Sequence, residues 1–500
     1  MRPTFAALAL LGTLSLSWES QAADWNQWRG PLRDGVAPTS PPLIESLPKE
    51  GLLPTWKYDD VPSGFEGGWS SPVIADGKVY LYSHQRIKLE ETEPPKRKFP
   101  WLPPDKRGHL TAEEYKEYEV NRRKEDFEMG TRFYRFEEFL HCLDAATGKV
   151  VWKDTRPSSY TRFVHSGTPA AVDGKVYIAS AARKARCFDA KSGDLVWETT
   201  IPGDFHDEFF MSSFAVVDGV AVAQVGTLCG LDAESGKVLW QLEGDSARMY
   251  HSSPVFWDGP KGKRIIANIG GDKTVCVEPK TGRECWRVES MANQSSPVIS
   301  GDMMITYGGS RKKGLRCFKL QEDKAEPAWV YQGLSDSGSS PVIVGKNVFV
   351  QGERRLAAVD LETGKAHWRT TLDYAKPRYT SLLAGDNKVI YAMEGILIFE
   401  ASDERFEPLI EARVGPEGRL ASEDVIRKLV GLGSEGVDPE KAQSIFQNKV
   451  VKAGPLLCST PALADGKLYV RLRDSVVCYD LTNAKGTVSA KTAPKGAAAN

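Results

Sequence analysis

The sequence predicts an all-β fold, an eight-bladed β-propeller of four-stranded antiparallel blades with two partly helical inserts on one face. Three observations predict it. A hairpin that ends in tryptophan recurs along the chain, a second hairpin precedes it, and most copies are spaced by about 40–46 residues, the length of a propeller blade. Because one pair of hairpins cannot bury both of its faces, the units must stack around a common axis.

The tryptophan-ending hairpin has a fixed spacing. In LDAATGKVVW, which starts at Leu143, the acidic residue is followed four positions later by glycine and eight positions later by tryptophan. The glycine suits a turn position with positive φ, and the flanking apolar runs suit two antiparallel strands. The same spacing recurs in the hairpins that end at Trp152, Trp197, Trp240, Trp286 and Trp368.

The second hairpin consists of a strand, a turn of the Asp-Gly type and another strand. Its copies start at Ser70, Ser166, Ser212, Ser252, Ser295, Ser339, Thr380 and Ser459. The segment around Trp56 resembles an outermost strand without a blade of its own, and the last unit lacks such a strand. We therefore expect the Trp56 strand to complete the last blade and to close the ring.

Two inserts, at about 87–138 and 402–456, interrupt a propeller expected to span residues 53–486. Thr111 and Glu114 predict a capping box at the start of a helix in the first insert. The first insert falls in a loop between the second and third strands of a unit, and the second falls between two units. Since both connections leave the same end of the strands, the insert-bearing face is the predicted working surface.

The two ends of the chain have different characters. Residues 1–23 are expected to be a signal peptide, because Arg2 precedes an apolar segment that ends in small residues; an uncleaved anchor is the alternative. Export places the protein in a bacterial periplasm or outside the cell, with no later transmembrane segment. Residues 24–52 are expected to form an arm that lies across the propeller, and residues 487–500 a disordered tail.

Composition excludes several classes of function. The formal net charge of −1 gives no reason to expect binding to nucleic acid or to a membrane surface. No phosphate-binding loop, nucleophile elbow, zinc-binding helix motif or dinucleotide fingerprint occurs in a suitable context. We expect a monomer.

Eight cysteines in an exported chain suggest disulfides, but the repeat argues against them. Five occupy equivalent strand positions in different units, where neighbours lie about 10 Å apart and cannot be bridged. We predict that these five are free and serve as small apolar side chains: Cys142, Cys187, Cys276, Cys317 and Cys478. The pairing of Cys229, Cys285 and Cys458 stays open.

These hairpins are similar to the tryptophan-docking repeats of the pyrroloquinoline-quinone-type β-propellers, over residues 53–486 without the inserts. The resemblance implies that the five tryptophans pack between blades against the turn of the next blade. Trp329 is offset by two residues, and its role stays open. The family includes quinoprotein alcohol dehydrogenases, which carry an adjacent Cys-Cys disulfide, and non-catalytic propellers of outer-membrane assembly. With no adjacent cysteines and no matching carboxylate motif, this chain resembles the second class more.

The residue before each innermost strand is expected at the rim of the central funnel. The candidate ligand-binding residues there are Trp69, His165, His251, Gln294 and Tyr379, in the company of Met211, Gly338 and Cys458. Arg162 and Arg378 lie close to them in sequence and are candidates for holding an anion by paired hydrogen bonds. The alternative is that these aromatic and histidine side chains only plug the mouth of the channel.

Other polar clusters give weaker signals. His165 and His251 suggest a metal, but no carboxylate is spaced to complete a site, so no metal is predicted. Acidic residues in 203–210 either bind calcium or form a solvated loop. Basic residues such as Arg311 and Arg354 fall in loops of the insert-bearing face, where they meet an anionic partner or are neutralised by the acidic inserts.

The favoured interpretation is a secreted, non-catalytic binding or scaffold module that engages a protein or a small ligand on the insert-bearing face. It needs no cofactor, and no catalytic residue is assigned. One alternative is a quinoprotein dehydrogenase of alcohols or sugars that uses pyrroloquinoline quinone with calcium. The other is a sensor of small molecules or glycans, with Trp69 and Tyr379 as stacking surfaces. The fold alone does not decide among them.

Overall fold

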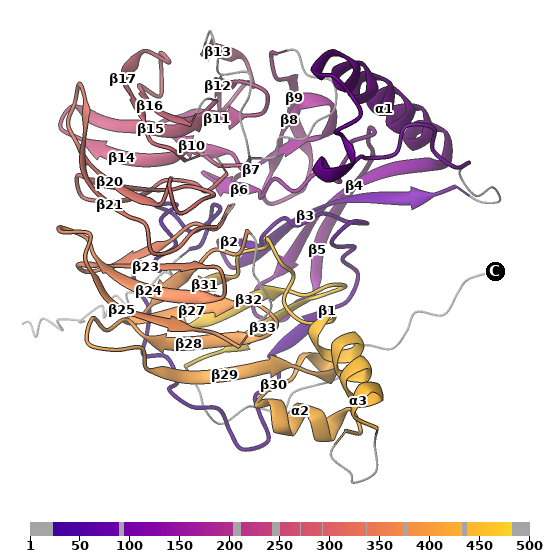
Figure 1. Ribbon diagram of the computed structural model, residues 1–500, viewed down its shortest axis with the longest axis vertical. Coiled ribbons are helices and arrows are strands. Elements are labelled where there is room, and N and C mark those ends of the chain that lie inside the picture. Colours follow the sequence, from indigo (N-terminus) through magenta and orange to yellow (C-terminus); the bar gives the residue numbers. More distant parts are fainter. Residues whose placement is uncertain are drawn as a thin grey trace, which may run out of the picture.

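The computed structural model describes residues 24–89, 95–203, 212–242, 251–270, 272–292, 294–336, 338–373, 379–432 and 438–482. Within these residues the chain forms eight antiparallel sheets, and the innermost strands lie nearer the centre of the molecule than the outermost ones (Figure 1). The eight-bladed propeller of four-stranded blades is therefore confirmed.

Each of the first four blades is formed by consecutive strands, ordered here from the innermost to the outermost. Blade 1 comprises β2 (Val73–Ala75), β3 (Lys78–Lys88), β4 (Tyr134–Asp144) and β5 (Val150–Pro157). Blade 2 comprises β6 (Ala170–Val172), β7 (Lys175–Ser180), β8 (Lys184–Asp189) and β9 (Leu195–Thr200). Blade 3 comprises β10 (Ala215–Val217), β11 (Val220–Gln224), β12 (Leu228–Asp232) and β13 (Val238–Gln241). Blade 4 comprises β14 (Val255–Gly259), β15 (Gly262–Ile269), β16 (Lys273–Val277) and β17 (Glu284–Glu289).

The remaining blades follow the same order except at the closure. Blade 5 comprises β18 (Val298–Ser300), β19 (Met303–Tyr307), β20 (Leu315–Leu320) and β21 (Ala325–Tyr331). Blade 6 comprises β22 (Val342–Val344), β23 (Asn347–Gly352), β24 (Arg355–Asp360) and β25 (Ala366–Thr371). Blade 7 comprises β26 (Leu383–Gly385), β27 (Lys388–Ala392), β28 (Ile396–Glu400) and β29 (Pro408–Val414), to which β30 (Leu420–Ala421) adds. Blade 8 comprises β31 (Ala462–Ala464), β32 (Lys467–Arg471), β33 (Val476–Asp480) and β1 (Trp56–Tyr58).

The N-terminal strand closes the ring as predicted. Trp56 pairs with Cys478 and Tyr58 with Val476, so β1 forms the outer edge of blade 8. Arg471 on β32 reinforces this closure from inside. Its Nη1 donates to the main-chain oxygen of Ser70 at 2.7 Å, and its Nη2 donates to that of Pro62 at 2.7 Å. The N-terminal segment is thereby tied to the last blade by main-chain pairing and by one buried guanidinium.

The indole side chains connect successive blades. The Nε1 of Trp197, for example, donates to the main-chain oxygen of Ala233 at 3.1 Å. Trp329 docks in the same way, because it pairs across its sheet with Cys317 just as Trp152 pairs with Cys142. Strand register, rather than the residue count through the turn, fixes the tryptophan position. The full set of docked indoles is Trp56, Trp152, Trp197, Trp240, Trp286, Trp329 and Trp368.

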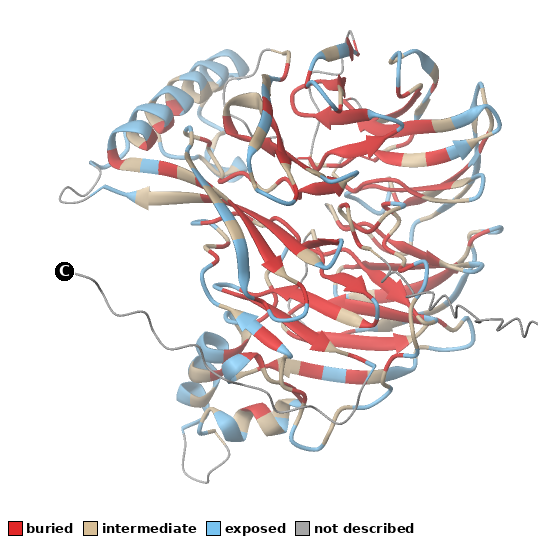
Figure 2. Cartoon of the chain, turned by 180° about the vertical axis from the view of Figure 1, so that it is seen from behind, coloured by how far each residue is buried: buried red, intermediate tan, exposed pale blue. Residues whose placement is uncertain are grey.

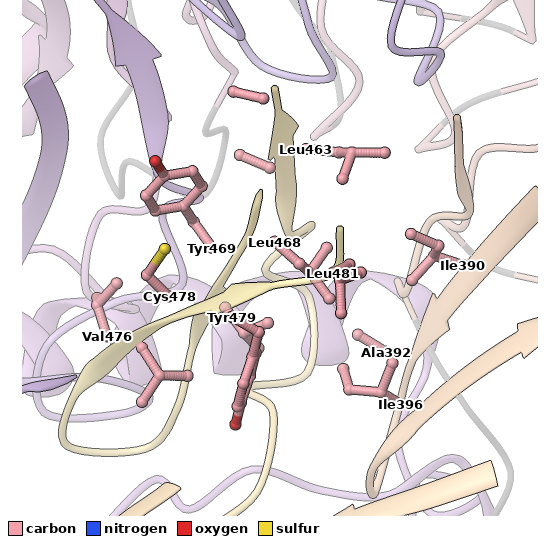
Figure 3. Close-up of a cluster of buried hydrophobic side chains, with 14 of the residues drawn as sticks. Ile390, Ala392, Ile396, Leu463, Leu468, Tyr469, Val476, Cys478, Tyr479 and Leu481 are labelled. Carbon is pink, nitrogen blue, oxygen red and sulfur yellow. The ribbon is translucent and has the colours of Figure 1, made fainter. Parts of the chain in front are cut away.

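Aliphatic side chains fill the space between neighbouring blades. Figure 3 shows one such cluster, in which Ile390 and Ile396 of blade 7 lie near Leu468 and Tyr479 of blade 8, all fully buried. All eight cysteines are free, and the five at equivalent strand positions are buried. They contribute to this packing in the way the repeat predicts.

The N-terminal arm occupies the bore of the propeller, whereas the sequence suggested that it lies across it. Trp25 pairs with Ile74 of blade 1, and the main-chain nitrogen of Ala37 donates to Ala384 of blade 7 at 2.8 Å. The reason is physical. The innermost strands turn their unpaired edges toward the axis, and buried main-chain groups without partners are costly.

Helices occur in the two inserts. In the first, η1 (Pro104–Lys106) precedes α1 (Ala112–Phe133), which begins with the predicted capping box of Thr111 and Glu114 and is largely exposed (Figure 2). The second contains η4 (Pro416–Gly418), α2 (Glu423–Leu429), α3 (Pro439–Phe446) and the π-turn η5 (Gln447–Val451). The short η2 (Ala181–Arg183) joins β7 to β8. None of the helices in the described ranges has the length and apolar content to cross a bilayer.

Candidate functional site

A belt of hydroxyl groups surrounds the axis at the start of the innermost strands. The main-chain nitrogen of Ser253 in blade 4, for instance, donates to Ser296 Oγ in blade 5 at 2.7 Å. Within the described residues, seven such hydrogen bonds of 2.7–3.1 Å link blades 1 to 7 in order and blade 8 to blade 1. Sequence reasoning missed this belt, although its signal is present: the second residue of the second hairpin is Ser or Thr in seven of the eight copies, and the third residue, Thr168, takes this place in the copy that starts at Ser166. These residues are Ser71, Thr168, Ser213, Ser253, Ser296, Ser340, Ser381 and Thr460.

A cavity of about 430 Å³ opens above this belt. Its volume lies in the range of roughly 300–1,000 Å³ that is usual for small-molecule sites. Its lining combines aromatic rings and one leucine with the hydroxyl groups of serine and threonine side chains, most of them from the belt. The lining residues are Trp28, Phe65, Trp69, Phe163, Ser166, Thr168, Ser213, His251, Ser253, Gln294, Ser296, Gly338, Tyr379, Ser381, Leu457, Cys458 and Thr460.

The floor of this funnel cavity is formed by Trp28 of the N-terminal arm. The guanidinium groups of Arg29 and Arg33 lie 5.7 and 5.9 Å from the centroid of its ring. Both side chains are completely buried. Arg29 donates to the main-chain oxygen of Pro341 at 2.5 Å, and Arg33 donates to that of Pro254 at 2.6 Å. The arm is therefore held in the bore at the lining of the cavity by two buried guanidinium groups.

Burial changes the titration of these two guanidinium groups. It lowers the pKa of Arg29 to about 10 and that of Arg33 to about 9, because the charged form loses hydration. Both remain protonated at neutral pH. Hydrogen bonds to main-chain oxygens near the innermost strands offset part of the cost of burying these two charges. Because these bonds join the arm to several blades, they fix the arm in the bore.

Apart from His165, the predicted rim residues and the two nearby arginines separate into three groups. Trp69, His251, Gln294 and Tyr379 line the funnel cavity together with Gly338 and Cys458. Arg162 lines a different cavity, beside α1. Arg378 and Met211 lie outside the described residues, as does most of the acidic stretch 203–210. Whether any of these residues binds a ligand stays a prediction.

His165 does not reach the funnel. It is 1 % exposed, its ring meets Tyr82 edge-on at 6.1 Å, and its main-chain nitrogen donates to His84 Nδ1 at 2.8 Å. Desolvation lowers the pKa of His165 to about 3, so it is neutral. His165 is therefore a core residue of blades 1 and 2, and it neither lines the funnel nor plugs its mouth.

The described lining of the funnel cavity carries no Asp, Glu, Lys or Arg side chain. His251 is the titratable imidazole there, and desolvation lowers its pKa to about 4, which keeps it neutral at physiological pH. Its ring packs edge-on against Tyr379 at 6.5 Å. The cavity therefore offers aromatic faces and neutral hydrogen-bonding groups.

The described lining of the funnel does not fit pyrroloquinoline quinone with calcium. The quinone is planar and carries several carboxylates, which call for cationic partners. Arg29 and Arg33 are not part of the lining, and they lie beneath Trp28 with their bonds directed to main-chain oxygens. The described part of the chain also contains no cluster of three or more His, Cys, Asp or Glu side chains suited to a metal.

Comparisons with known proteins agree with the fold. The family model described as outer membrane protein assembly factor BamB matches residues 137–256 and 249–402. Among solved structures, BamB from Moraxella catarrhalis is 12% identical and covers 68% of this chain and 88% of that one, with a TM-score of 0.46. The quinohemoprotein alcohol dehydrogenase from Comamonas testosteroni is 12% identical and covers 96% and 82%, with a TM-score of 0.54.

A europium-containing methanol dehydrogenase is 10% identical and covers 92% of this chain and 98% of that one, with a TM-score of 0.55. No curated protein matches the chain. At such identities the likeness to solved structures shows the propeller fold and leaves the chemistry of the site open.

Proposed function

This chain belongs to the PQQ-like propeller family whose model is described as outer membrane protein assembly factor BamB, and from that premise we propose that it is an exported, non-catalytic binding propeller. Its funnel cavity accepts an uncharged aromatic or aliphatic group that a protein partner presents at the insert-bearing face.

One observation carries this proposal: the described lining of the funnel is uncharged and contains several aromatic rings. Beneath Trp28, Arg29 and Arg33 bind main-chain oxygens of the innermost strands and hold the arm in the bore. Ring faces and neutral hydroxyl groups favour apolar groups with few polar atoms. Such a site suits the anchoring of a side chain or a small neutral ring.

The rim supports a partner larger than the cavity. Phe65 is 68% exposed and Leu457 is 43% exposed, and both lie at the mouth. Large apolar side chains that remain in water around a pocket are typical of protein-binding surfaces. The family name refers to the assembly of outer-membrane proteins, and the predicted signal in residues 1–23 agrees with an exported location.

The quinoprotein dehydrogenase alternative is weaker. Oxidation of an alcohol needs a group that removes the hydroxyl proton, and the described lining offers no carboxylate for that role. Titration of the chain from residue 24 onward with pyrroloquinoline quinone and calcium tests this alternative. Stoichiometric binding with reduction of a dye by simple alcohols would replace the binding proposal by the enzymatic one.

A sensor of small neutral rings is the second candidate. It is favoured by the convergence of Trp28, Trp69 and Tyr379 on one cavity, with Phe65 edge-on to Trp69 at 5.3 Å. Three rings from distant parts of the chain can enclose a planar ligand. Binding of a free ring compound to the purified protein, with no protein captured in cells, would favour the sensor.

Photo-crosslinking tests the scaffold proposal. A photoreactive benzoylphenylalanine replaces Phe65 at the mouth in cells, and a matched chain carries it at Lys191 in an exposed turn at the other end of blade 2. We expect one exported protein to crosslink at position 65, to be lost with Trp69→Ala, and not to crosslink at position 191. Equal products at both positions, or none at position 65, would contradict the proposal.

A further inference from the structure

The third and fourth strands of blade 4 each carry a cysteine. Cys276 lies on β16, and Cys285 lies on β17 directly before the docked Trp286. Blades 1 and 2 have a cysteine only at the first of these positions, with Val151 and Val196 at the second. The second thiol of blade 4 is thus a departure from the repeat.

A β-bulge brings Cys285 opposite Cys276. Cys276 pairs with Trp286, whereas the next residue, Val277, pairs with Glu284, so Cys285 is the extra residue of β17. In a bulge, two residues of one strand oppose one residue of the other. Both cysteines belong to one hydrophobic cluster, in which Cys276 is fully buried and Cys285 is partly buried. Their side chains therefore lie on the same side of blade 4.

This position is compatible with the spacing of a disulfide. Residues that face each other in antiparallel strands have Cα atoms about 4.5–5.5 Å apart, and disulfides join Cα atoms about 4.4–6.8 Å apart. The two thiols also interact, because burial raises the pKa of Cys276 above its usual range and the Cys285 thiol beside it raises that pKa further. Both are thiols in the structure, so a bond between them requires a separate oxidation step.

The two thiols differ in their access to solvent. Cys276 is fully buried, whereas Cys285 is partly exposed, and its Sγ lies 4.0 Å from the main-chain oxygen of Arg283 in an exposed turn. The adjacent Trp286 connects blade 4 to blade 5, since its Nε1 donates to the main-chain oxygen of Gln321 at 3.1 Å. A bond at this place would join two strands beside a contact between blades.

We propose that Cys276 and Cys285 form a disulfide by exchange with a disulfide-containing donor, and that this bond locks the hairpin that carries Trp286. The Cys285 thiolate attacks one sulfur of the donor and releases one donor thiol. The Cys276 thiolate then attacks the Sγ of Cys285 in the mixed disulfide and releases the second donor thiol. The protein loses two electrons and two protons, and the donor gains them. The site is independent of the funnel.

Peptide mapping tests the bond in the reduced chain from residue 24 onward. The protein is incubated with oxidised glutathione, unfolded in excess alkylating reagent and digested with trypsin, which cleaves after Lys280 and Arg283. We expect peptide 274–280 to be linked to peptide 284–287, and the link to disappear on reduction. Cys187, buried at the equivalent position of blade 2, is the internal control and should be alkylated. Alkylation of both Cys276 and Cys285, or a link from Cys285 to a different cysteine, would overturn the proposal.

Three variants use residue types that other blades have at the same positions. Cys276→Ala, which copies Ala358 of blade 6, should leave glutathione attached to Cys285, because the resolving thiol is missing. Cys285→Val should leave Cys276 alkylated. Val196→Cys should create a link to Cys187, because the bulge of blade 2 has the same register. If Val196→Cys gives no link, the bulge does not bring the two thiols within reach, and the geometric basis of the proposal is wrong.

Urea unfolding tests the locking of the hairpin. The oxidised protein should unfold at a higher urea concentration than the reduced protein, because the bond restricts the unfolded chain. Cys285→Val should unfold at the same concentration after both treatments. Equal midpoints for the oxidised and reduced parent protein would show that the bond does not lock the hairpin.

Discussion

The turn glycines of the two kinds of hairpin share a positive φ but differ in what surrounds them. Gly282 has a φ of 68°, and a Cβ there would lie 2.5 Å from Trp240 of the preceding blade. Gly77 has a similar φ of 70°, but a Cβ there would meet no atom within 4 Å. Substitutions at Gly77 and Gly282 therefore separate the cost of backbone strain from the cost of disturbing the docked indole.

We expect Gly77→Ala to lower the free energy of unfolding by about 1–2 kcal/mol, through left-handed backbone strain alone. Gly282→Ala should lower it by about 1–3 kcal/mol more, because the Trp240 indole must move out of a packed site. Urea unfolding of both variants measures the difference. Equal losses would mean that contact between the turn and the indole adds nothing to stability.

Three buried histidines make stability depend on pH. Desolvation lowers the pKa of His84 to about 4 and those of His141 and His165 to about 3, against about 6.5 in the unfolded chain. Between these values the unfolded state binds more protons, so stability is complete above pH 6.5 and falls as the pH drops below it. Each histidine should remove about 2 kcal/mol between pH 7 and pH 5.

Urea unfolding at these two pH values measures the loss, and His141→Gln should reduce the difference by about 2 kcal/mol. The readout is the change with pH within one protein, so a uniform destabilisation by the substitution does not affect it. A pH difference that is the same in the variant and the parent would show that His141 titrates normally.

At the scale of elements, the arm forms main-chain hydrogen bonds with the innermost strands of several blades. The main-chain nitrogens of Ile74, Ala171 and Ala384 donate to Trp25, Asn26 and Gly35 of the arm at 2.8–2.9 Å. A chain that begins at residue 39 lacks these acceptors. We expect these three amides to lose their protection against hydrogen exchange, because their only acceptors in the bore are gone.

The amide of Val222, which lies inside β11 away from the bore, is the matched control and should keep its protection. Loss of protection at Val222 as well would mean that the arm is needed for the whole propeller. Retained protection at Ile74 would mean that another segment replaces the arm, and the account of the bore would be wrong.

How much the sequence predicts depends on how local the signal is. Hairpin turns are encoded within about ten residues, so the blades and the capping box at Thr111 follow from spacing. The docking of the five regularly spaced tryptophans follows from the family resemblance, whereas that of Trp329 is fixed by strand register. The position of Arg29 and Arg33 does not, because it depends on the bore that eight distant strands create. Arg162 likewise lies close to His165 in sequence, yet it lines the cavity beside α1 and not the funnel.

The lining of the candidate site can therefore be predicted only in part from the sequence. The residue before each innermost strand is at the funnel for Trp69, His251, Gln294 and Tyr379, but the adjacent His165 is drawn into the core. Trp28 and Phe65, which form the floor and part of the mouth, come from segments without a repeat. The belt of Ser and Thr is different, because the repeat contains its signal but the sequence analysis did not use it.

At the scale of the whole molecule, we expect closure of the ring by β1 to keep the protein monomeric. Three register pairs join β1 to β33, and without β1 the edge of β33 offers unpaired main-chain groups. Exposed strand edges pair with other chains. We expect a chain that begins at residue 62 to self-associate with increasing concentration, whereas a chain that begins at residue 39 keeps β1 and stays monomeric.

Analytical sedimentation of the two shortened chains over a range of concentrations measures this difference. Both lack the arm, so the comparison isolates β1. A synthetic peptide of residues 53–60 should restore the monomer of the shorter chain, because it supplies the missing strand in trans. If the shorter chain stays monomeric without the peptide, blade 8 protects its own edge, and the N-terminal strand serves stability rather than solubility.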